Sequence, residues 1–334
     1  MKAAILGRQN PLSFRRIMQE NLRRAGHEAD ILDMESRNFL DFAQRLTDYD
    51  AIITCGERVP AQAIQTLAKG SVRLLSRWGV GTEEIDREEA ARQGIAVCNA
   101  PDTLSIAVAE CALAMMLNLL REFPARDAAV RRNDWSWFFE GILSHQMEGK
   151  TVGLVGFGSI ARALAKMLCG FDCRVVACDD YSWSEEAARK YGVTRVSLDE
   201  ILDTADVVSL HYASTPDTQG MVNRAFLERM KDTAILINTA RGALIDEDAL
   251  IWALKNRVIR AAGLDVFRQE PPSPESELLK LDNTMLLPHS GAGTFECLQK
   301  SSAAASQNVI DFFAGRPVKS ILNPAYIQAR RGHR

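Results

Sequence analysis

The sequence predicts an α/β protein built from two parallel-sheet domains, and three observations lead to this fold class. The chain has 334 residues, which is long for one domain and enough for two domains that each bury a core. Short apolar runs alternate with helical stretches in two separate series, a rhythm typical of parallel sheets with crossover helices. Its 47% hydrophobic and 25% charged residues, with a net charge of -3, are typical of a globular protein and provide no broad cationic surface for nucleic acid or anionic lipid.

The first series supplies the expected strands of one sheet. Most are short runs rich in Ala, Val, Ile and Leu that end near Gly or Pro. The runs are 3–7, 28–34, 51–56, 72–79 and 95–101, with a helix expected over 13–26, a long apolar helix over 104–120 and an aromatic segment over 134–143. We expect a cytoplasmic protein without a membrane segment, because the apolar runs near the N-terminus and over 111–120 are too short for a signal sequence or a span.

The second series supplies the expected strands of the other sheet. These runs are 151–156, 174–180, 206–212, 234–240, 261–267 and 285–289, followed by a helix over 294–313 and a Pro-containing tail with a frayed basic end at 329–334. The seven cysteines form no C-x-x-C pair and none lies beside a histidine at metal-ligand spacing. We therefore expect reduced thiols and no metal site.

A glycine-rich turn follows the first strand of the second series. Gly156 and Gly158 stand where backbone N–H groups at a helix N-terminus would approach a pyrophosphate. The third position of the G-x-G-x-x-G fingerprint is Ala161, which adds only a methyl group and stays within the tolerated pattern. The motif alone also fits an ordinary strand-to-helix turn, so its context decides whether a dinucleotide binds.

An acidic residue at the end of the next strand favours NAD as that dinucleotide. Asp179 lies at about the distance from Gly156 at which a carboxylate accepts hydrogen bonds from the adenine ribose. A carboxylate there repels the 2′-phosphate of NADP, and the segment 180–186 contains acidic residues but no arginine. The alternative is that Asp179 is a solvated turn residue.

Three charged residues follow later strands of the second series. Arg241, Glu270 and His289 each come just after a predicted strand, and ligands of open α/β sheets bind at the carboxyl ends of strands. Hydride transfer at C2 of a 2-hydroxy acid requires a group that exchanges the hydroxyl proton and a cation for the carboxylate. A histidine suits the first task, a glutamate beside it would favour its protonated form and fix its orientation, and an arginine suits the second. Taken singly, each residue also fits a solvated loop.

Together, these motifs resemble the D-isomer-specific 2-hydroxyacid dehydrogenases, the family of phosphoglycerate dehydrogenase, glyoxylate/hydroxypyruvate reductase and formate dehydrogenase. The resemblance covers nearly the whole chain, from "RWGVGTEEID" through "AVAEC", "GKTVGLVGFGSIA", "NTARGALIDEDAL" and "GLDVFRQEP" to "PHSGAGT". It implies that Arg241 binds substrate, that Glu270 supports His289 as proton donor or acceptor, and that Asp265 lies near the nicotinamide. The other residues it implies are Ser159, Ile160, Asp179, Thr239 and Ala240 for NAD, and Trp78 and Gly79 for the substrate carboxylate.

The resemblance also implies a discontinuous architecture. A doubly wound Rossmann NAD-binding domain over 103–290 is expected to be inserted in a flavodoxin-like substrate-binding domain made of 1–102 and 291–334. Members usually dimerise through the segment that contains "AVAECALAMML", so a homodimer is expected, with packing as the expected role of the aromatic residues over 135–139.

Several substrate-side positions depart from the family pattern and leave the substrate open. Glu83 and Glu84 replace an Asp-Asn-like pair, Leu104 replaces an asparagine, and Tyr212 begins a segment that lacks the usual proline. Cys55 stands where phosphoglycerate dehydrogenases carry an arginine suited to a phosphate, which favours a glyoxylate- or hydroxypyruvate-like acid over 3-phosphoglycerate. A different class of function, an NAD-sensing interaction protein of the corepressor type, keeps similar residues; the chain lacks the long disordered flanks that would favour it.

Overall fold

The computed structural model describes residues 1–7, 11–34, 39–141 and 143–332. The chain folds into two compact units, Met1–Leu104 with Thr294–Arg334, and Ser105–Gly293. The first unit is thus discontinuous in sequence, and the second is inserted into it. The predicted boundaries after residues 102 and 290 lie close to these.

The first unit contains a five-stranded parallel sheet in the order β2-β1-β3-β4-β5. Its strands are β1 (Lys2–Ile5), β2 (Glu28–Ile31), β3 (Ala51–Thr54), β4 (Leu74–Arg77) and β5 (Ala96–Cys98). This is the flavodoxin-like order, as expected. The central strand β3 is buried at all four residues, because helices cover both faces of the sheet.

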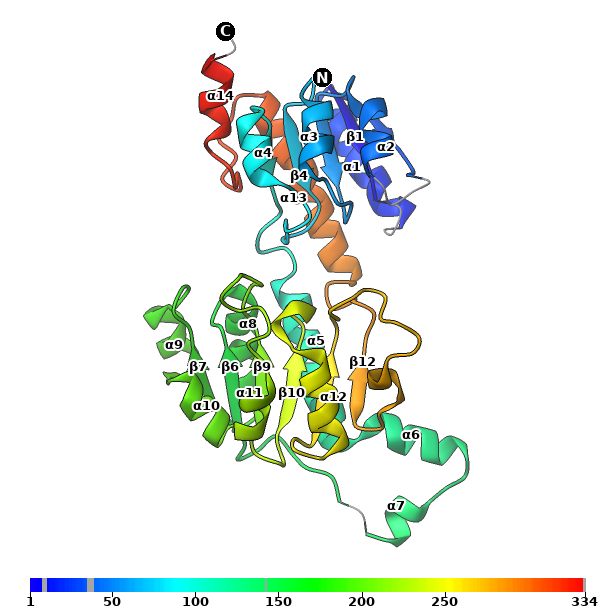
Figure 1. Cartoon of the computed structure of the whole chain (residues 1–334), viewed down its shortest axis with the longest axis vertical. Helices are drawn as coiled ribbons and strands as arrows, with labels where there is room; N and C mark the ends of the chain where they lie inside the picture. Colours follow the sequence, from blue (N-terminus) through cyan, green and yellow to red (C-terminus); the bar gives the residue numbers. More distant parts are fainter. Residues whose placement is uncertain (8–10, 35–38, 142, 333–334) are drawn as a thin grey trace. The chain divides into compact units, whose positions relative to one another are not determined.

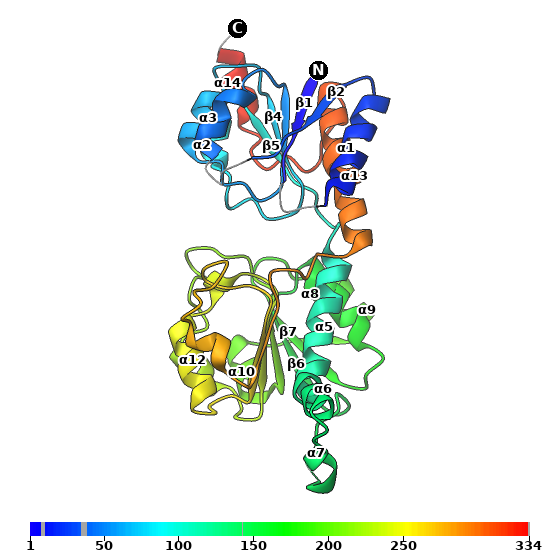
Figure 2. The ribbon, with the colours of Figure 1, turned by 90° about the vertical axis from the view of Figure 1, so that its right-hand side faces the viewer.

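Helices on the two faces of this sheet enclose separate cores. One core, with Phe14, Met18 and Val309, lies under α1 and α13, and the other, with Phe39 and Ile64, lies under α2 and α3 (Figure 2). The helices of the unit are α1 (Leu12–Arg24), α2 (Phe39–Ala43), the 3₁₀ helix η1 (Gln44–Leu46), α3 (Ala61–Leu67), α4 (Arg87–Arg92), α13 (Phe295–Phe313) and α14 (Tyr326–Gly332).

The end of the chain is anchored on the edge strand β5. Leu322 donates its backbone N–H to the Val97 carbonyl at 2.8 Å, and the Asn323 side chain accepts from the Val97 N–H at 2.8 Å and donates to the Ile95 carbonyl at 2.9 Å. Residues 326–332 then form α14. The expectation of a frayed end over 329–334 was therefore wrong for 329–332, because this segment continues a helix that follows the anchored Asn323, and residues 333–334 lie outside the described part of the chain.

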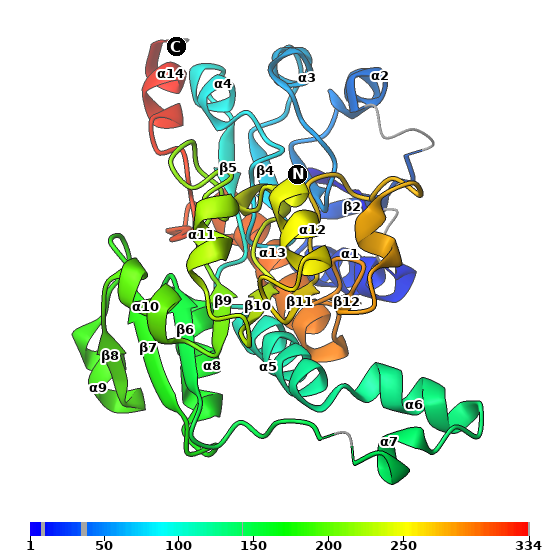
Figure 3. The same ribbon diagram turned by 60° about the horizontal axis from the view of Figure 1, so that its bottom comes forward.

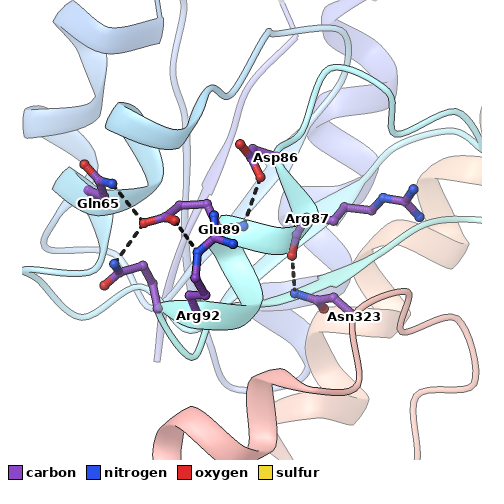
Figure 4. Close-up of polar contacts among 7 residues, drawn as sticks. Gln65, Asp86, Arg87, Glu89, Arg92 and Asn323 are labelled. Atoms are coloured by element: carbon purple, nitrogen blue, oxygen red, sulfur yellow. Dashed lines mark hydrogen bonds and ion pairs between the residues drawn. The ribbon is translucent and has the colours of Figure 1, made fainter. Parts of the chain in front are cut away.

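A buried carboxylate organises α4, next to this anchor. Glu89 is only 5% exposed, and its carboxylate accepts hydrogen bonds from the side chains of Gln65 at 3.0 Å, Gln93 at 2.9 Å and Arg92 at 2.8 Å (Figure 4). Three donors on one carboxylate satisfy a charge that would otherwise be costly to bury. The cluster is self-contained and holds α4 beside α3.

The second unit contains a seven-stranded parallel sheet in the order β12-β11-β10-β9-β6-β7-β8 (Figure 1). Its strands are β6 (Thr151–Val155), β7 (Arg174–Cys178), β8 (Val193–Arg195), β9 (Val207–Leu210), β10 (Ile235–Asn238), β11 (Ala261–Leu264) and β12 (Thr284–Leu286). From β6 onward this is the Rossmann order 3-2-1-4-5-6 with one further strand, which confirms the predicted fold class. The edge strand β8 was not predicted, since three residues with one buried side chain carry almost no pattern.

Helices cover both faces of this sheet as well. The helices of the unit are α5 (Ser105–Arg121), α6 (Phe123–Arg131), α7 (Ser136–Phe139), α8 (Ser159–Leu168), α9 (Glu185–Tyr191), α10 (Leu198–Thr204), α11 (Arg224–Arg229), η2 (Gly242–Leu244), α12 (Glu247–Lys255) and η3 (Glu277–Lys280). α5, α8 and α9 lie on one face and α10 and α12 on the other, whereas α6 and α7 extend away from the sheet (Figures 2 and 3). No helix in the described part of the chain is long and apolar enough to cross a membrane.

Candidate functional site

The glycine-rich turn lies at the point where the strand order of the second sheet reverses. Gly156 follows β6 and has a φ of +100°. A Cβ atom added to it would lie 2.9 Å from the backbone carbonyl carbon of His211, the residue that follows β9. Only glycine fits this approach of two backbones. At Gly158, by contrast, an added Cβ would meet nothing within 4 Å, so the surface over this residue is open to a ligand.

The helix α8 begins directly at this open turn. Gly158 is its N-cap residue, and Ser159 and Ile160 form its first turn, where backbone N–H groups have no partner within the helix. Ala161 is fully buried in the core under α8, so the methyl group that replaces the third glycine is accommodated. An open glycine turn leading into a ten-residue helix fits the pyrophosphate of a dinucleotide.

Asp179 lies beside this turn, buried to 3% exposure. One carboxylate oxygen accepts the Phe157 N–H at 2.5 Å, and the other accepts the N–H groups of Tyr181 and Ser182, each at 2.6 Å. Burial alone would raise the pKa of Asp179, but these backbone hydrogen bonds and the nearby Arg162 outweigh it and lower the pKa. Asp179 is therefore ionised at neutral pH, and it also holds the glycine turn and the loop after β7 in place.

The segment after β10 is held by a buried amide. The Asn238 side chain donates to the Arg241 carbonyl at 2.9 Å and accepts from the Ala240 N–H at 3.0 Å. Thr239 is 7% exposed, and its hydroxyl has no hydrogen-bond partner among the described residues. The Arg241 side chain is half-buried and donates to the Ala240 carbonyl at 2.7 Å. A buried hydroxyl and an anchored guanidinium at the carboxyl edge of the sheet suit a polar ligand.

Glu270 and His289 form a direct pair at the same edge. The His289 Nδ1 lies 2.7 Å from a Glu270 carboxylate oxygen, and the two side chains are 38% (Glu270) and 53% (His289) exposed. The other carboxylate oxygen of Glu270 accepts the Phe267 N–H at 3.1 Å. With Nδ1 engaged by the carboxylate, Nε2 is the imidazole nitrogen available to a ligand.

Asp265 holds the histidine loop, a role that the sequence did not reveal. It is 2% exposed, and its two carboxylate oxygens accept the N–H groups of Ser290 at 2.7 Å and Gly291 at 2.8 Å. Its backbone carbonyl accepts the His289 N–H at 2.8 Å. His289 has a left-handed backbone with φ 54°, which is uncommon for a residue other than glycine. Three hydrogen bonds that Asp265 accepts therefore hold His289 in an unfavourable conformation that presents its imidazole to Glu270.

His211, at the carboxyl end of β9, is a second histidine, and sequence reasoning left it without a role. Its Nε2 has no partner among the described residues, and burial of the imidazole lowers its pKa to about 4. The side chain is therefore neutral at physiological pH, and the residue packs directly behind the Gly156 turn.

Acidification should destabilise the second unit through His211. In the unfolded chain the imidazole binds a proton near pH 6.5, whereas in the folded chain it does so only near pH 4, so the unfolded state binds more protons between these values and stability falls as the pH is lowered. We expect a loss of about 2 kcal/mol between pH 7 and pH 5 from this residue. Urea unfolding of wild type and His211→Gln at both pH values checks it: the variant should lose correspondingly less, and equal losses would contradict the assignment.

Trp78 and Gly79 follow β4 of the first unit. The Trp78 backbone N–H already donates to the Thr54 carbonyl at 2.8 Å, its indole donates to the Ser301 hydroxyl at 2.9 Å, and the Gly79 N–H donates to the Arg77 carbonyl at 3.0 Å. Binding of a carboxylate by these two backbone N–H groups would require them to leave or share these partners. Their substrate-binding role stays a prediction.

The cysteines and acidic groups offer no metal centre in the described residues. All seven cysteines are free thiols, of which Cys98, Cys178 and Cys297 are buried. No group of three or more His, Cys, Asp or Glu side chains in the described ranges could hold a metal ion. The groups at this edge that can take part in chemistry are the imidazole, the carboxylates and the guanidinium described above.

Comparisons with known proteins find one family of dehydrogenases. The model of the D-isomer specific 2-hydroxyacid dehydrogenase NAD binding domain matches residues 113–291, within the second unit. A glyoxylate reductase of Pyrococcus furiosus is 37% identical over 86% of this chain and 86% of its own length. A D-3-phosphoglycerate dehydrogenase of Archaeoglobus fulgidus is 35% identical over 90% of this chain, which spans only 56% of that relative. The apo-structure of D-lactate dehydrogenase from Escherichia coli superposes with a TM-score of 0.83 at 29% identity, covering 96% of this chain and 100% of the other.

Proposed function

The chain belongs to the D-isomer specific 2-hydroxyacid dehydrogenase family of NAD-dependent oxidoreductases, and we propose that its substrates are a small 2-keto acid and the corresponding D-2-hydroxy acid. The observation that carries this proposal is the contact between Glu270 and His289, which the Asp265 clamp holds at the same sheet edge as the open glycine turn. Glyoxylate and hydroxypyruvate are the acids favoured, because the P. furiosus relative that the chain matches over most of its length is a glyoxylate reductase.

His289, Glu270 and Arg241 each have one role in the proposed chemistry. When bound, NAD supplies the hydride acceptor, and NADH the hydride donor, for C2 of the substrate. His289 Nε2 donates a proton to the keto oxygen during reduction and removes it during oxidation. Glu270 fixes the imidazole through Nδ1, while Arg241 binds the carboxylate and the oxygen on which negative charge develops.

The residues that would hold NAD surround the glycine turn. Gly156 and Gly158 leave room for the pyrophosphate, and the backbone N–H groups of Ser159 and Ile160 point from the first turn of α8. Asp179 would accept the ribose hydroxyls. Thr239 and Ala240, after β10, would line the nicotinamide side, with Asp265 acting through the loop that it anchors.

Replacing Asp179 with Ser should weaken NAD binding about tenfold and reduce the preference for NAD over NADP, because the repulsion of the 2′-phosphate would be lost. Asp180, the neighbouring exposed carboxylate, provides a matched control, because Asp180→Ser should leave the affinities for NAD and NADP nearly unchanged. Fluorescence titration of both reduced cofactors into wild type and the two variants measures the effect. The assignment fails if wild type binds NADP as tightly as NAD, or if Asp180→Ser has the larger effect.

A substrate panel tests the proposed substrate class. NADH oxidation should be measured with glyoxylate, hydroxypyruvate, pyruvate, longer 2-keto acids and 3-phosphohydroxypyruvate. We expect turnover of glyoxylate or hydroxypyruvate to exceed that of the phosphorylated acid, because burial raises the pKa of the Cys55 thiol to about 11 and leaves an uncharged group where a phosphate would need a cation. Preference for the phosphorylated acid would overturn this choice, and turnover of none would overturn the substrate class.

A homodimer and a cytoplasmic location complete the proposal. The apolar side of α5 supports dimerisation less than expected, because residues such as Met115 and Met116 are buried within the unit itself. The exposed apolar side chains that a partner subunit could bury lie instead on and just after α7, which extends away from the sheet (Figure 3). Phe138 and Phe139 are 75% and 80% exposed, and Leu143 is 83% exposed. Seven free thiols suit a reducing compartment.

A further inference from the structure

The first unit contains a cavity of about 500 Å³ that the proposed chemistry does not use. Arg73, which immediately precedes β4, forms one side of it. The end of α13 and the loop from Gly315 to Ile321 form the remaining walls, with Tyr326 at the start of α14. The cavity therefore lies at the amino end of its sheet, whereas the ligand edge of such a sheet is the carboxyl end.

Aromatic rings give this cavity a flat apolar lining. Phe312 and Phe313 lie with ring centroids 5.2 Å apart, and Phe312 and Tyr326 lie 6.2 Å apart with an interplanar angle of 42°. Tyr326 is only 9% exposed, so its ring is fixed in the wall. Rings at these distances pack against one another, so a planar aromatic ligand would lie against the lining that they form rather than between them.

Two arginines line the cavity, and each has an aspartate partner outside the lining. Arg73 lies over the Phe313 ring, with its guanidinium carbon 4.4 Å from the centroid, and its ion pair with Asp50 is long at 4.0 Å. Asp50 is already engaged at 2.7 Å by the Lys2 backbone N–H. Arg316 pairs with Asp311, outside the lining, at 2.7 Å. All lining residues belong to the described part of the chain, and none of them is acidic.

The size and the chemistry of this lining define one class of ligand. A volume of about 500 Å³ lies within the range of cavities that hold small molecules. A guanidinium stacked on an aromatic ring keeps its N–H edge available for a bidentate bond to a carboxylate, sulfonate or phosphate. We propose that this cavity is a binding site for a small planar anion, which lies against the aromatic lining with its anionic group at the two arginines.

The probe that tests the site is 2-naphthoate, with 2-naphthamide as its uncharged counterpart. Binding should be followed by saturation-transfer NMR on the full chain saturated with NADH, so that the adenine site is occupied. We expect 2-naphthoate to bind with a Kd of about 1 mM or tighter and 2-naphthamide to bind about tenfold more weakly. Arg73→Gln and Arg316→Gln should each weaken binding of the anion about tenfold, through loss of a charge-assisted hydrogen bond.

Two further variants distinguish binding in this cavity from binding to surface charge and from binding in the substrate site. Arg24→Gln removes a surface arginine of the same unit, which contacts Glu20, and should bind the probe as wild type does. Arg241→Lys should also leave probe binding unchanged, because Arg241 belongs to the proposed substrate site. Failure of the proposed function and failure of this second site are therefore distinguishable. Reductase activity should be unaffected in Arg316→Gln. The Arg316 side chain is exposed, so the variant should fold as wild type does, and a melting curve checks this.

The site is refuted if wild type shows no binding of 2-naphthoate up to about 5 mM, if 2-naphthamide binds equally well, or if both arginine variants bind as wild type does. Loss of binding in Arg241→Lys would also refute it, by placing the probe in the substrate site. Weakened binding confined to Arg73→Gln and Arg316→Gln supports it.

Discussion

Replacing His289 with Asn should lower reductase kcat/KM by about 10²- to 10⁴-fold, the usual contribution of a positioned proton donor. Asparagine retains a side-chain amide but cannot donate and regain a proton near neutral pH. NADH affinity should not change, because His289 lies on the loop after β12 and not at the glycine turn that follows β6. Stopped-flow reduction of the best acid from the panel, with a melting curve for each protein, measures the effect.

Glu270→Gln provides the companion test, because it removes the charge beside the imidazole while keeping a side chain that can reach it at a similar distance. Without that charge the imidazole loses the charge-assisted hydrogen bond that orients it, so reductase kcat/KM should fall while NADH affinity stays unchanged. Ser290→Ala, a change in the same loop that leaves the backbone bond to Asp265 intact, should retain the wild-type kcat/KM. A fully active His289→Asn, or a fully active Glu270→Gln, would remove the pair from the proposed chemistry.

The fold and the edge that carries the site could be predicted because both depend on local patterns. Strands buried on both faces read as continuous apolar runs, and the residues after them, such as Asp179, Arg241 and His289, reach the carboxyl edge by the geometry of a parallel sheet alone. Gly156 was predictable from the local G-x-G pattern, and the close approach of His211 in the folded chain explains why only glycine fits there. The strand order of both sheets followed from the family resemblance rather than from the pattern.

What could not be predicted depends on hydrogen bonds between residues far apart in sequence. Asp265 looked like a residue near the nicotinamide, yet its carboxylate is used by two backbone N–H groups 25 and 26 residues further along the chain. No spacing rule marks such a clamp. Likewise, the family resemblance assigns the substrate carboxylate to Trp78 and Gly79, and only the folded chain shows that the backbone N–H groups of both have partners.

The tail and the long apolar helix illustrate a second limit. A sequence shows that α5 has an apolar side but not what covers it, and here α8 and the sheet do so within the same unit. The sequence "ARRGHR" shows charge but not that Asn323, several residues earlier, fixes the chain against β5 and lets α14 form. In both cases the neighbour that decides the outcome is supplied by tertiary structure.

Replacing Arg241 with Lys should lower kcat/KM by about 10- to 10²-fold even though the positive charge is kept. The guanidinium can engage a carboxylate and the developing alkoxide with two parallel N–H bonds, whereas an ammonium is a single compact charge on a flexible stem. Because negative charge grows on the substrate oxygen during reduction, the lost bond is stronger in the transition state than in the ground state, so kcat should fall together with a rise in KM. The Arg241 carbonyl is held by the Asn238 side chain, so the backbone position should survive the change.

Steady-state kinetics and NADH titration of Arg241→Lys distinguish this role from a structural one. A structural arginine would lower the melting temperature and NADH affinity, whereas a substrate-binding arginine changes KM and kcat with NADH affinity unaltered. Arg268→Lys, at an exposed position in the loop after β11, is the matched control and should behave as wild type. If Arg241→Lys retains wild-type kinetics, Arg241 has no place in the site, and the carboxylate must be bound by another cation or by backbone N–H groups.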